Sequence, residues 1–234
     1  MNGVVFRSMP YSETSFILDI YTRQKGLNSY IISGIRKRGA KSGSSLYKPM
    51  SFLNFIAYSG STDKLFRIKE AKLDLVFNKI PYDVVRSTVA IFMIDLCRQS
   101  IREKESNEPL FDFILDQFRT LDNLPKLHSD YHMSFAVALS RFLGFFPRNN
   151  FDEENIFFDL ENGLFIPSTD GLKHYLSGAE SAAMSAMIQN SEDRPKLTKK
   201  EREHLLDGLV DYYRLHVDGF QKLPSLEVCR TIFN

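Results

Sequence analysis

Residues 16–33 read FILDIYTRQKGLNSYIIS, and their pattern indicates the fold of the first part of the chain. Two runs rich in β-branched and aromatic residues, Phe16–Thr22 and Leu27–Ser33, flank a Lys25-Gly26 turn. A strand, a glycine-containing turn and a second strand form the sequence pattern of a β-hairpin. The stretch therefore predicts two neighbouring strands joined by a short turn.

Three further β-prone runs lie on either side of this hairpin: Gly3–Phe6, Ser51–Tyr58 and Leu65–Leu73. Five short strands within about 75 residues indicate a small barrel or sandwich. Between the runs Leu27–Ser33 and Ser51–Tyr58, residues 34–48 read GIRKRGAKSGSSLYK, with three glycines and five basic residues. This composition predicts a positively charged loop.

From Pro81 onward the apolar residues recur with the period of a helix. Pro109 and Pro224 suit first helical turns, Thr198 and Glu201 have the spacing of a capping box, and 171–189 is a weaker helical segment. The second part is therefore predicted to be a bundle of about five or six helices. Its apolar stripes are Val85, Val89, Phe92 and Leu96; Phe111, Ile114, Phe118 and Leu121; His132, Phe135, Ala136, Leu139, Phe142 and Leu143; and Leu206, Leu209, Val210, Tyr213 and Val217.

An insertion at residues 145–170 interrupts the helical pattern. Asn162-Gly163 separates the β-prone runs 156–160 and 164–166, which predicts a small hairpin whose two turn residues both take positive φ.

The charge of the chain is unevenly distributed. The net charge is +1, but residues 1–72 hold 12 Lys and Arg against 4 Asp and Glu, and residues 73–234 hold 18 against 25. The balances, +8 and −7, suggest that the first part meets a polyanion and that the second part has a different role. Hydrophobic residues make up 43% and charged residues 25%, which is globular composition and excludes disordered and collagenous classes.

The cysteines and the apolar runs bear on the compartment. Two cysteines are too few for a disulfide framework or a four-thiolate zinc site. The first residues do not form a signal peptide, and no run reaches the ~20 apolar residues of a membrane span. A cytoplasmic location and no membrane partner are expected.

A search for enzyme motifs finds no phosphate-binding glycine loop, no HExxH and no nucleophile elbow. His128 and His132 have a metal-ligand spacing, but no carboxylate or thiolate is evidently placed to complete such a site. The acidic run 152–154 lacks the EF-hand pattern and is interpreted as a solvated loop. We therefore predict no catalytic residue, no metal and no cofactor.

The basic first part favours a nucleic-acid interface. Cations bind phosphates with counterion release, and aromatic faces can stack on unpaired bases. The alternative for the aromatics, Tyr11, Tyr21, Tyr30, Tyr47, Phe52, Phe55, Tyr58 and Phe66, is that most of them fill the barrel core. The predicted DNA-binding residues are Arg7, Arg23, Lys25, Arg36, Lys37, Arg38, Lys41, Lys48, Lys64 and Arg67.

Several ordered motifs along the chain resemble those of the RecO family of bacterial recombination mediators. They are Gly3-Val4-Val5, the stretch 11–18 (YSETSFIL), the stretch 21–26 (YTRQKG) and the stretch 33–37 (SGIRK), followed downstream by 143–147 (LGFFP), 212–216 (YYRLH), Gly219-Phe220 and 225–228 (SLEV). The resemblance covers nearly the whole chain.

The resemblance implies an α+β protein with an OB-fold DNA-binding barrel at residues 1–76 and a helical domain at 77–234. Many family members carry a four-cysteine zinc motif where this chain has 147–167 without cysteine. Here the hairpin insertion at 145–170, with Phe151, Phe157, Phe158 and Phe165, is expected to replace the metal with an apolar cluster. The chain also begins close to its Gly-Val-Val motif, so the first strand is expected to be clipped or to begin differently.

The resemblance further implies a non-enzymatic mediator that binds single- and double-stranded DNA and anneals complementary strands. With RecR it would help RecA to load onto strands coated by the single-strand-binding protein (SSB). The C-terminal tail of SSB would dock on the helical domain, where the candidate residues are Arg141, Phe142, Phe145 and Arg148. The alternatives are an OB-fold RNA-binding module with a helical interaction domain, and an enzyme such as a metal-dependent nuclease.

Overall fold

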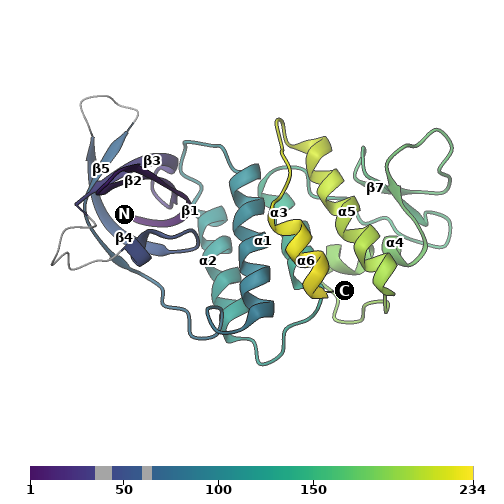
Figure 1. Cartoon of the computed structure of the whole chain (residues 1–234). Coiled ribbons are helices and arrows are strands. Elements are labelled where there is room, and N and C mark those ends of the chain that lie inside the picture. The colour runs from purple at the N-terminus through teal and green to yellow at the C-terminus, as the bar shows by residue number, and fades with distance from the viewer. Residues whose placement is uncertain (35–43, 60–64, 234) are drawn as a thin grey trace. The chain divides into compact units, whose positions relative to one another are not determined.

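The computed structural model describes residues 1–34, 44–59 and 65–233 (Figure 1). The chain falls into two compact units, Met1–Pro125 and Lys126–Asn234. The first unit begins with the strands β1 (Asn2–Ser12), β2 (Ser15–Thr22), β3 (Gly26–Ser33), β4 (Phe52–Ser59) and β5 (Phe66–Leu73). The helices α1 (Val84–Ser100) and α2 (Glu108–Asn123) follow.

The five strands close into a barrel in the order β1-β2-β3-β5-β4. β3 and β5 run parallel, and the other neighbouring pairs run antiparallel. Five strands in a closed barrel of this kind form an OB-fold. The predicted N-terminal OB-fold followed by helices and a small hairpin is confirmed.

The barrel core is filled by side chains that alternate along the strands, as a half-buried sheet requires. Tyr30 contacts the ring of Phe55 edge-on with centroids 5.2 Å apart, and burial raises the pKa of Tyr30 to about 12. A 3-10 turn, η1 (Ser44–Tyr47), which the sequence did not predict, contributes Tyr47 to this core. The buried core residues are Val5, Leu18, Ile20, Tyr30, Ile32, Tyr47, Leu53, Phe55 and Ile68.

The first strand is longer than the predicted Gly3–Phe6. β1 pairs with β2 along its length, with irregularities between Val5 and Arg7 and between Pro10 and Ser12. Pro10 has no N–H to donate, and an irregularity in the register is where a strand tolerates such a residue. The strand therefore continues through Pro10 to Ser12.

Aromatic contacts join the barrel to α2 within the first unit. Phe52 of β4 lies 5.4 Å from Phe118 of α2, and Phe77 contacts both rings. Asp122 near the end of α2 accepts hydrogen bonds from the backbone N–H groups of residues 78–80. Burial works to raise the pKa of Asp122, but these donors outweigh burial and hold the pKa below its usual value. The segment between β5 and α1 is thus fixed to α2.

The second unit contains α3 (Tyr131–Phe142), α4 (Gly178–Ile188), α5 (Lys199–His216) and α6 (Ser225–Phe233). A three-stranded sheet in the order β7-β6-β8 lies between α3 and α4 in the sequence, built from β6 (Phe157–Asp159), β7 (Leu164–Ile166) and β8 (Tyr175–Leu176). The capping box of Thr198 and Glu201 at the start of α5 is confirmed.

Two details of the second unit differ from the sequence predictions. Only Gly163 of the Asn162-Gly163 pair has positive φ, because the β6–β7 connection spans four residues, 160–163. The side chain of Asp159 holds this connection by accepting from the backbone of Glu161 and the amide of Asn162. The helix predicted over 171–189 begins only at Gly178, because the preceding residues form β8 on the edge of β6.

Candidate nucleic-acid interface

Five of the ten predicted DNA-binding cations lie on the described barrel, and two of these are held by carboxylates. Arg7 Nε lies 2.7 Å from Asp19 Oδ2. Arg23 lies 2.9 Å from Asp112 and 3.1 Å from Glu108, so a phosphate at either arginine would compete with an existing ion pair. The other five predicted cations lie outside the described residues: Arg36, Lys37, Arg38, Lys41 and Lys64.

The remaining three cations, Lys25, Lys48 and Arg67, are exposed on the barrel. Arg67 is on β5, directly opposite Tyr58 of β4. Tyr58 is 51% exposed, so an aromatic face and a guanidinium lie together on the outer surface of the barrel. This pairing offers a flat face for a base and a cation for a phosphate.

The structure separates the predicted aromatics into core and surface residues. The surface residues are Tyr58 and Tyr11, which is 64% exposed. Phe66 is half-buried against Tyr30. The aromatics buried inside the first unit are Tyr21, Tyr30, Tyr47, Phe52 and Phe55.

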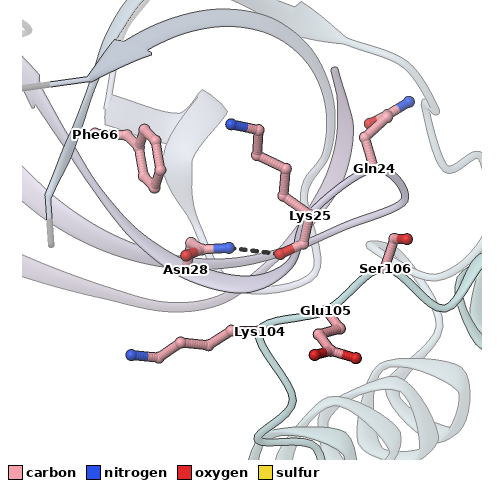
Figure 2. Close-up of a pocket in the computed structure, with 7 residues that line it drawn as sticks. All are labelled: Gln24, Lys25, Asn28, Phe66, Lys104, Glu105 and Ser106. Atoms are coloured by element: carbon pink, nitrogen blue, oxygen red, sulfur yellow. Dashed lines mark hydrogen bonds between the residues drawn. The ribbon is translucent and has the colours of Figure 1, made fainter. Parts of the chain in front are cut away.

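A hollow of about 560 Å³ lies beside the barrel, where the β2–β3 turn meets the connection between α1 and α2 (Figure 2). Lys25 Nζ lies over the ring of Phe66, 5.0 Å from its centroid, which is a cation–π contact. The sequence did not predict Lys104 as part of this surface, because its neighbours Glu103 and Glu105 cancel its charge in any local count. The lining residues are Gln24, Lys25, Asn28, Phe66, Lys104, Glu105 and Ser106.

The four residues predicted to bind a protein tail lie at and just after the end of α3. Arg141 and Arg148 are exposed, and the Arg141 guanidinium lies 3.9 Å from the ring centroid of Phe146. Phe142 and Phe145 are half-buried. The ring of Phe145 is already stacked on His216, with centroids 5.3 Å apart, so it contributes to internal packing.

The insertion before α4 is held together by aromatic rings. Phe165 lies 5.2 Å from Phe151 and 4.9 Å from Phe158, whereas Phe157 turns instead toward Tyr175 of β8. Over residues 1–34, 44–59 and 65–233, the structure places no three His, Cys, Asp or Glu side chains where they could jointly hold a metal ion. Within the same ranges, no helix is both long and apolar enough to span a membrane.

Two family models match the chain in sequence order. Recombination protein O N terminal matches residues 1–75, and Recombination protein O C terminal matches residues 81–227. The chain belongs to the RecO family of DNA repair proteins. The resemblance found in the sequence motifs is thereby confirmed.

Curated RecO proteins are similar to the chain over nearly its whole length. The "DNA repair protein RecO" of Phocaeicola vulgatus is 33% identical over 235 residues, which cover 99% of this chain and 98% of that protein. The "DNA repair protein RecO" of Bacteroides fragilis is 31% identical over 236 residues, with the same coverage. A third RecO, from Azobacteroides pseudotrichonymphae, is 25% identical over 235 residues, again covering 99% and 98%.

Proposed function

We propose that this RecO-family chain is a non-enzymatic mediator that binds single- and double-stranded DNA and anneals complementary strands. With RecR it helps RecA to load onto SSB-coated single strands during the repair of gaps and breaks. The single observation that carries the DNA-binding part is the exposed pair of Tyr58 and Arg67 on the outside of a closed OB barrel. The excess of +8 over residues 1–72 supports the same assignment.

The distribution of charge supports a division of labour between DNA and protein contacts. The electrostatic attraction between basic residues and phosphates contributes an affinity that falls steeply as the salt concentration rises. The balance of −7 over residues 73–234 disfavours DNA there and favours protein partners. We assign DNA contacts mainly to the barrel, at residues 1–76, and contacts with protein partners mainly to the remainder, 77–234.

Fluorescence anisotropy with labelled single strands, duplexes and RNA over a salt series tests the DNA-binding part. We expect single-stranded DNA to bind with an affinity that falls steeply as salt rises. The chain should also accelerate annealing of complementary strands coated with the cognate SSB. Absence of DNA binding at low salt would overturn the proposed function, and preference for RNA in competition would support an RNA-binding module instead.

The basic segment 34–48 is tested by reversing the charges of Arg36, Lys37, Arg38 and Lys41 together. Each phosphate contact that is lost should lower the slope of log affinity against log salt by about 0.7 for a single strand. The matched control reverses four exposed lysines of the second unit, Lys173, Lys196, Lys200 and Lys222. Equal binding by the wild type and the first variant would remove this segment from the DNA-binding surface.

The proposed SSB contact is tested with a labelled peptide of the cognate SSB tail, which ends in a phenylalanine and a carboxylate. Arg141 stacked on Phe146, with Arg148 nearby in sequence, offers cations next to an aromatic ring for such a peptide. Arg141→Glu and Arg148→Glu should each weaken peptide binding, whereas Lys173→Glu, an exposed control in the same unit, should not. Unchanged affinity in both arginine variants would place the tail elsewhere.

A further inference from the structure

The hollow beside the β2–β3 turn is a rigid feature of the first unit. Gly26, at φ +60, brings this turn so close to the α1–α2 connection that a Cβ would lie 2.3 Å from the Glu105 carbonyl oxygen. The backbone N–H of Leu27 donates to the Glu103 carbonyl oxygen at 2.9 Å. The Asn28 amide donates to the Lys25 carbonyl oxygen at 2.6 Å, which fixes the turn itself. Both walls of the hollow are therefore set before a ligand arrives.

The side chains in the hollow combine an aromatic face with two ammonium groups. Figure 2 shows Lys25 and Lys104 extending toward the Phe66 end of the hollow, on either side of Asn28. The carboxylate of Glu105 points away from Lys25 and toward the helices. Lys25 and Lys104 are exposed, so both ammonium groups are accessible to a ligand.

We propose that this hollow binds one nucleotide of an unpaired DNA strand. The base lies on the ring of Phe66, and the ammonium groups of Lys25 and Lys104 hold the flanking phosphates. The size of the hollow, about 560 Å³, lies within the range of about 300–1,000 Å³ that is usual for small-ligand clefts. The inference rests on the proposed function, and it extends the DNA path from the barrel to Lys104 in the α1–α2 connection.

The cation–π contact between Lys25 and Phe66 gives the site two states. In the free protein the ammonium covers the ring, 5.0 Å from its centroid. A stacked base contributes more binding free energy than an exposed cation–π contact, so a base displaces the Lys25 ammonium from the Phe66 ring. The released ammonium is then free to pair with a phosphate of the same strand, and one side chain serves both states.

The geometry selects an unpaired strand over a duplex. A base reaches the Phe66 ring only with one of its flat faces uncovered, and in a duplex both faces are covered by neighbouring base pairs. The same base and phosphate chemistry also exists in a free nucleotide. A free nucleotide carries a phosphate on one side of the base only. A strand supplies a phosphate on each side of the base, and Lys25 and Lys104 can therefore each bind one.

The test uses the full chain with a single strand that carries 2-aminopurine, whose fluorescence falls on stacking, and with a matched duplex. Phe66→Leu should weaken single-strand affinity about fivefold or more, the lower end of the effect of one stacked base. It should also reduce the quenching of 2-aminopurine, and it should leave duplex affinity unchanged. Lys104→Gln should lower the salt slope for the single strand by about 0.7, as one lost phosphate contact does.

The matched control for Lys104→Gln is Lys222→Gln, an exposed lysine of the second unit that should leave the slope unchanged. Phe66 also packs on Tyr30, so Phe66→Leu could unfold the protein. Lys104→Gln changes an exposed side chain and therefore provides an independent test in that case.

Wild-type quenching and a wild-type salt slope in both variants would overturn the proposal while leaving the proposed function intact. Competition by free thymidine monophosphate at the concentration of the strand would overturn it in favour of a nucleotide. Loss of all DNA binding by the wild type would instead remove the proposed function.

Discussion

His132 of α3 is a buried histidine that should make stability depend on pH. Its side chain is 1% exposed and its ring is stacked on Phe233 of α6, with centroids 4.6 Å apart. Burial lowers the pKa of His132 from 6.5 to about 4; Asp130 acts in the opposite direction and Arg202 in the same direction. The fold thus favours the neutral ring.

The size and sign of the effect follow from these two pKa values. Below about pH 6.5 the unfolded chain binds a proton that the folded chain does not bind until about pH 4. The free energy of unfolding therefore falls as the pH drops through this window. At about 1.4 kcal/mol for each unit of difference in pKa, the full loss is about 3 kcal/mol, and about 2 kcal/mol is lost by about pH 5.

Urea unfolding followed by circular dichroism, at about pH 7.5 and about pH 5, measures this contribution. His132→Leu should lose about 2 kcal/mol less than the wild type between the two pH values. Altered packing affects the variant at both pH values and cancels from the comparison. His128→Leu, at an exposed histidine just before α3, should keep the wild-type dependence. An equal loss of unfolding free energy for the wild type and His132→Leu would contradict the role assigned to His132.

Three further predictions concern the first unit. Gly26→Ala should lower the free energy of unfolding by about 2–4 kcal/mol, because it combines positive φ with backbone overlap at Glu105, and urea unfolding measures it. Asp122→Ala should cost about 2–4 kcal/mol by the same assay, since three backbone N–H groups lose their acceptor. Tyr58→Ala should weaken single-strand binding about fivefold or more in anisotropy, while stability changes by less than about 0.5 kcal/mol.

Matched variants separate these effects from general ones. Gly144→Ala also places a Cβ on a residue with positive φ, but this Cβ meets nothing within 4 Å. A loss of stability equal to that of Gly26→Ala would therefore exclude backbone overlap as the cause. Asp116→Ala removes an exposed carboxylate of α2 and should change stability little; a similar loss at both aspartates would contradict the role given to Asp122. Tyr82→Ala, at a tyrosine that is 86% exposed and outside the barrel strands, should leave DNA binding unchanged.

The sequence predicted the strands and helices well because their signals are local. Residues 16–22 and 27–33 are rich in β-prone side chains. The structure places β2 and β3 there, and their ends differ from the predicted ends by one residue at most. Shorter elements were missed. β8 has two residues and exists because it pairs with β6, so no periodicity within 171–177 reveals it.

The candidate site was less predictable, because it depends on partners that are distant in sequence. Arg23 meets Asp112, which lies 89 residues away, and nothing near Arg23 in the sequence shows that it is paired. Lys104 and Phe66 come together only because Gly26 brings two backbones into contact. Counting basic residues shows that the first part of the chain is basic, but it does not show which of these cations already have carboxylate partners.

The aromatic contact of Phe52 with Phe77 and Phe118 limits how the barrel could be moved to another protein. The barrel presents Phe52 and Tyr21 to α2 rather than to solvent. A barrel transplanted to another protein without α1 and α2 would carry this apolar surface uncovered and would tend to self-associate. Any recombined or shortened form of the protein that retains DNA binding should therefore contain the five barrel strands together with α1 and α2.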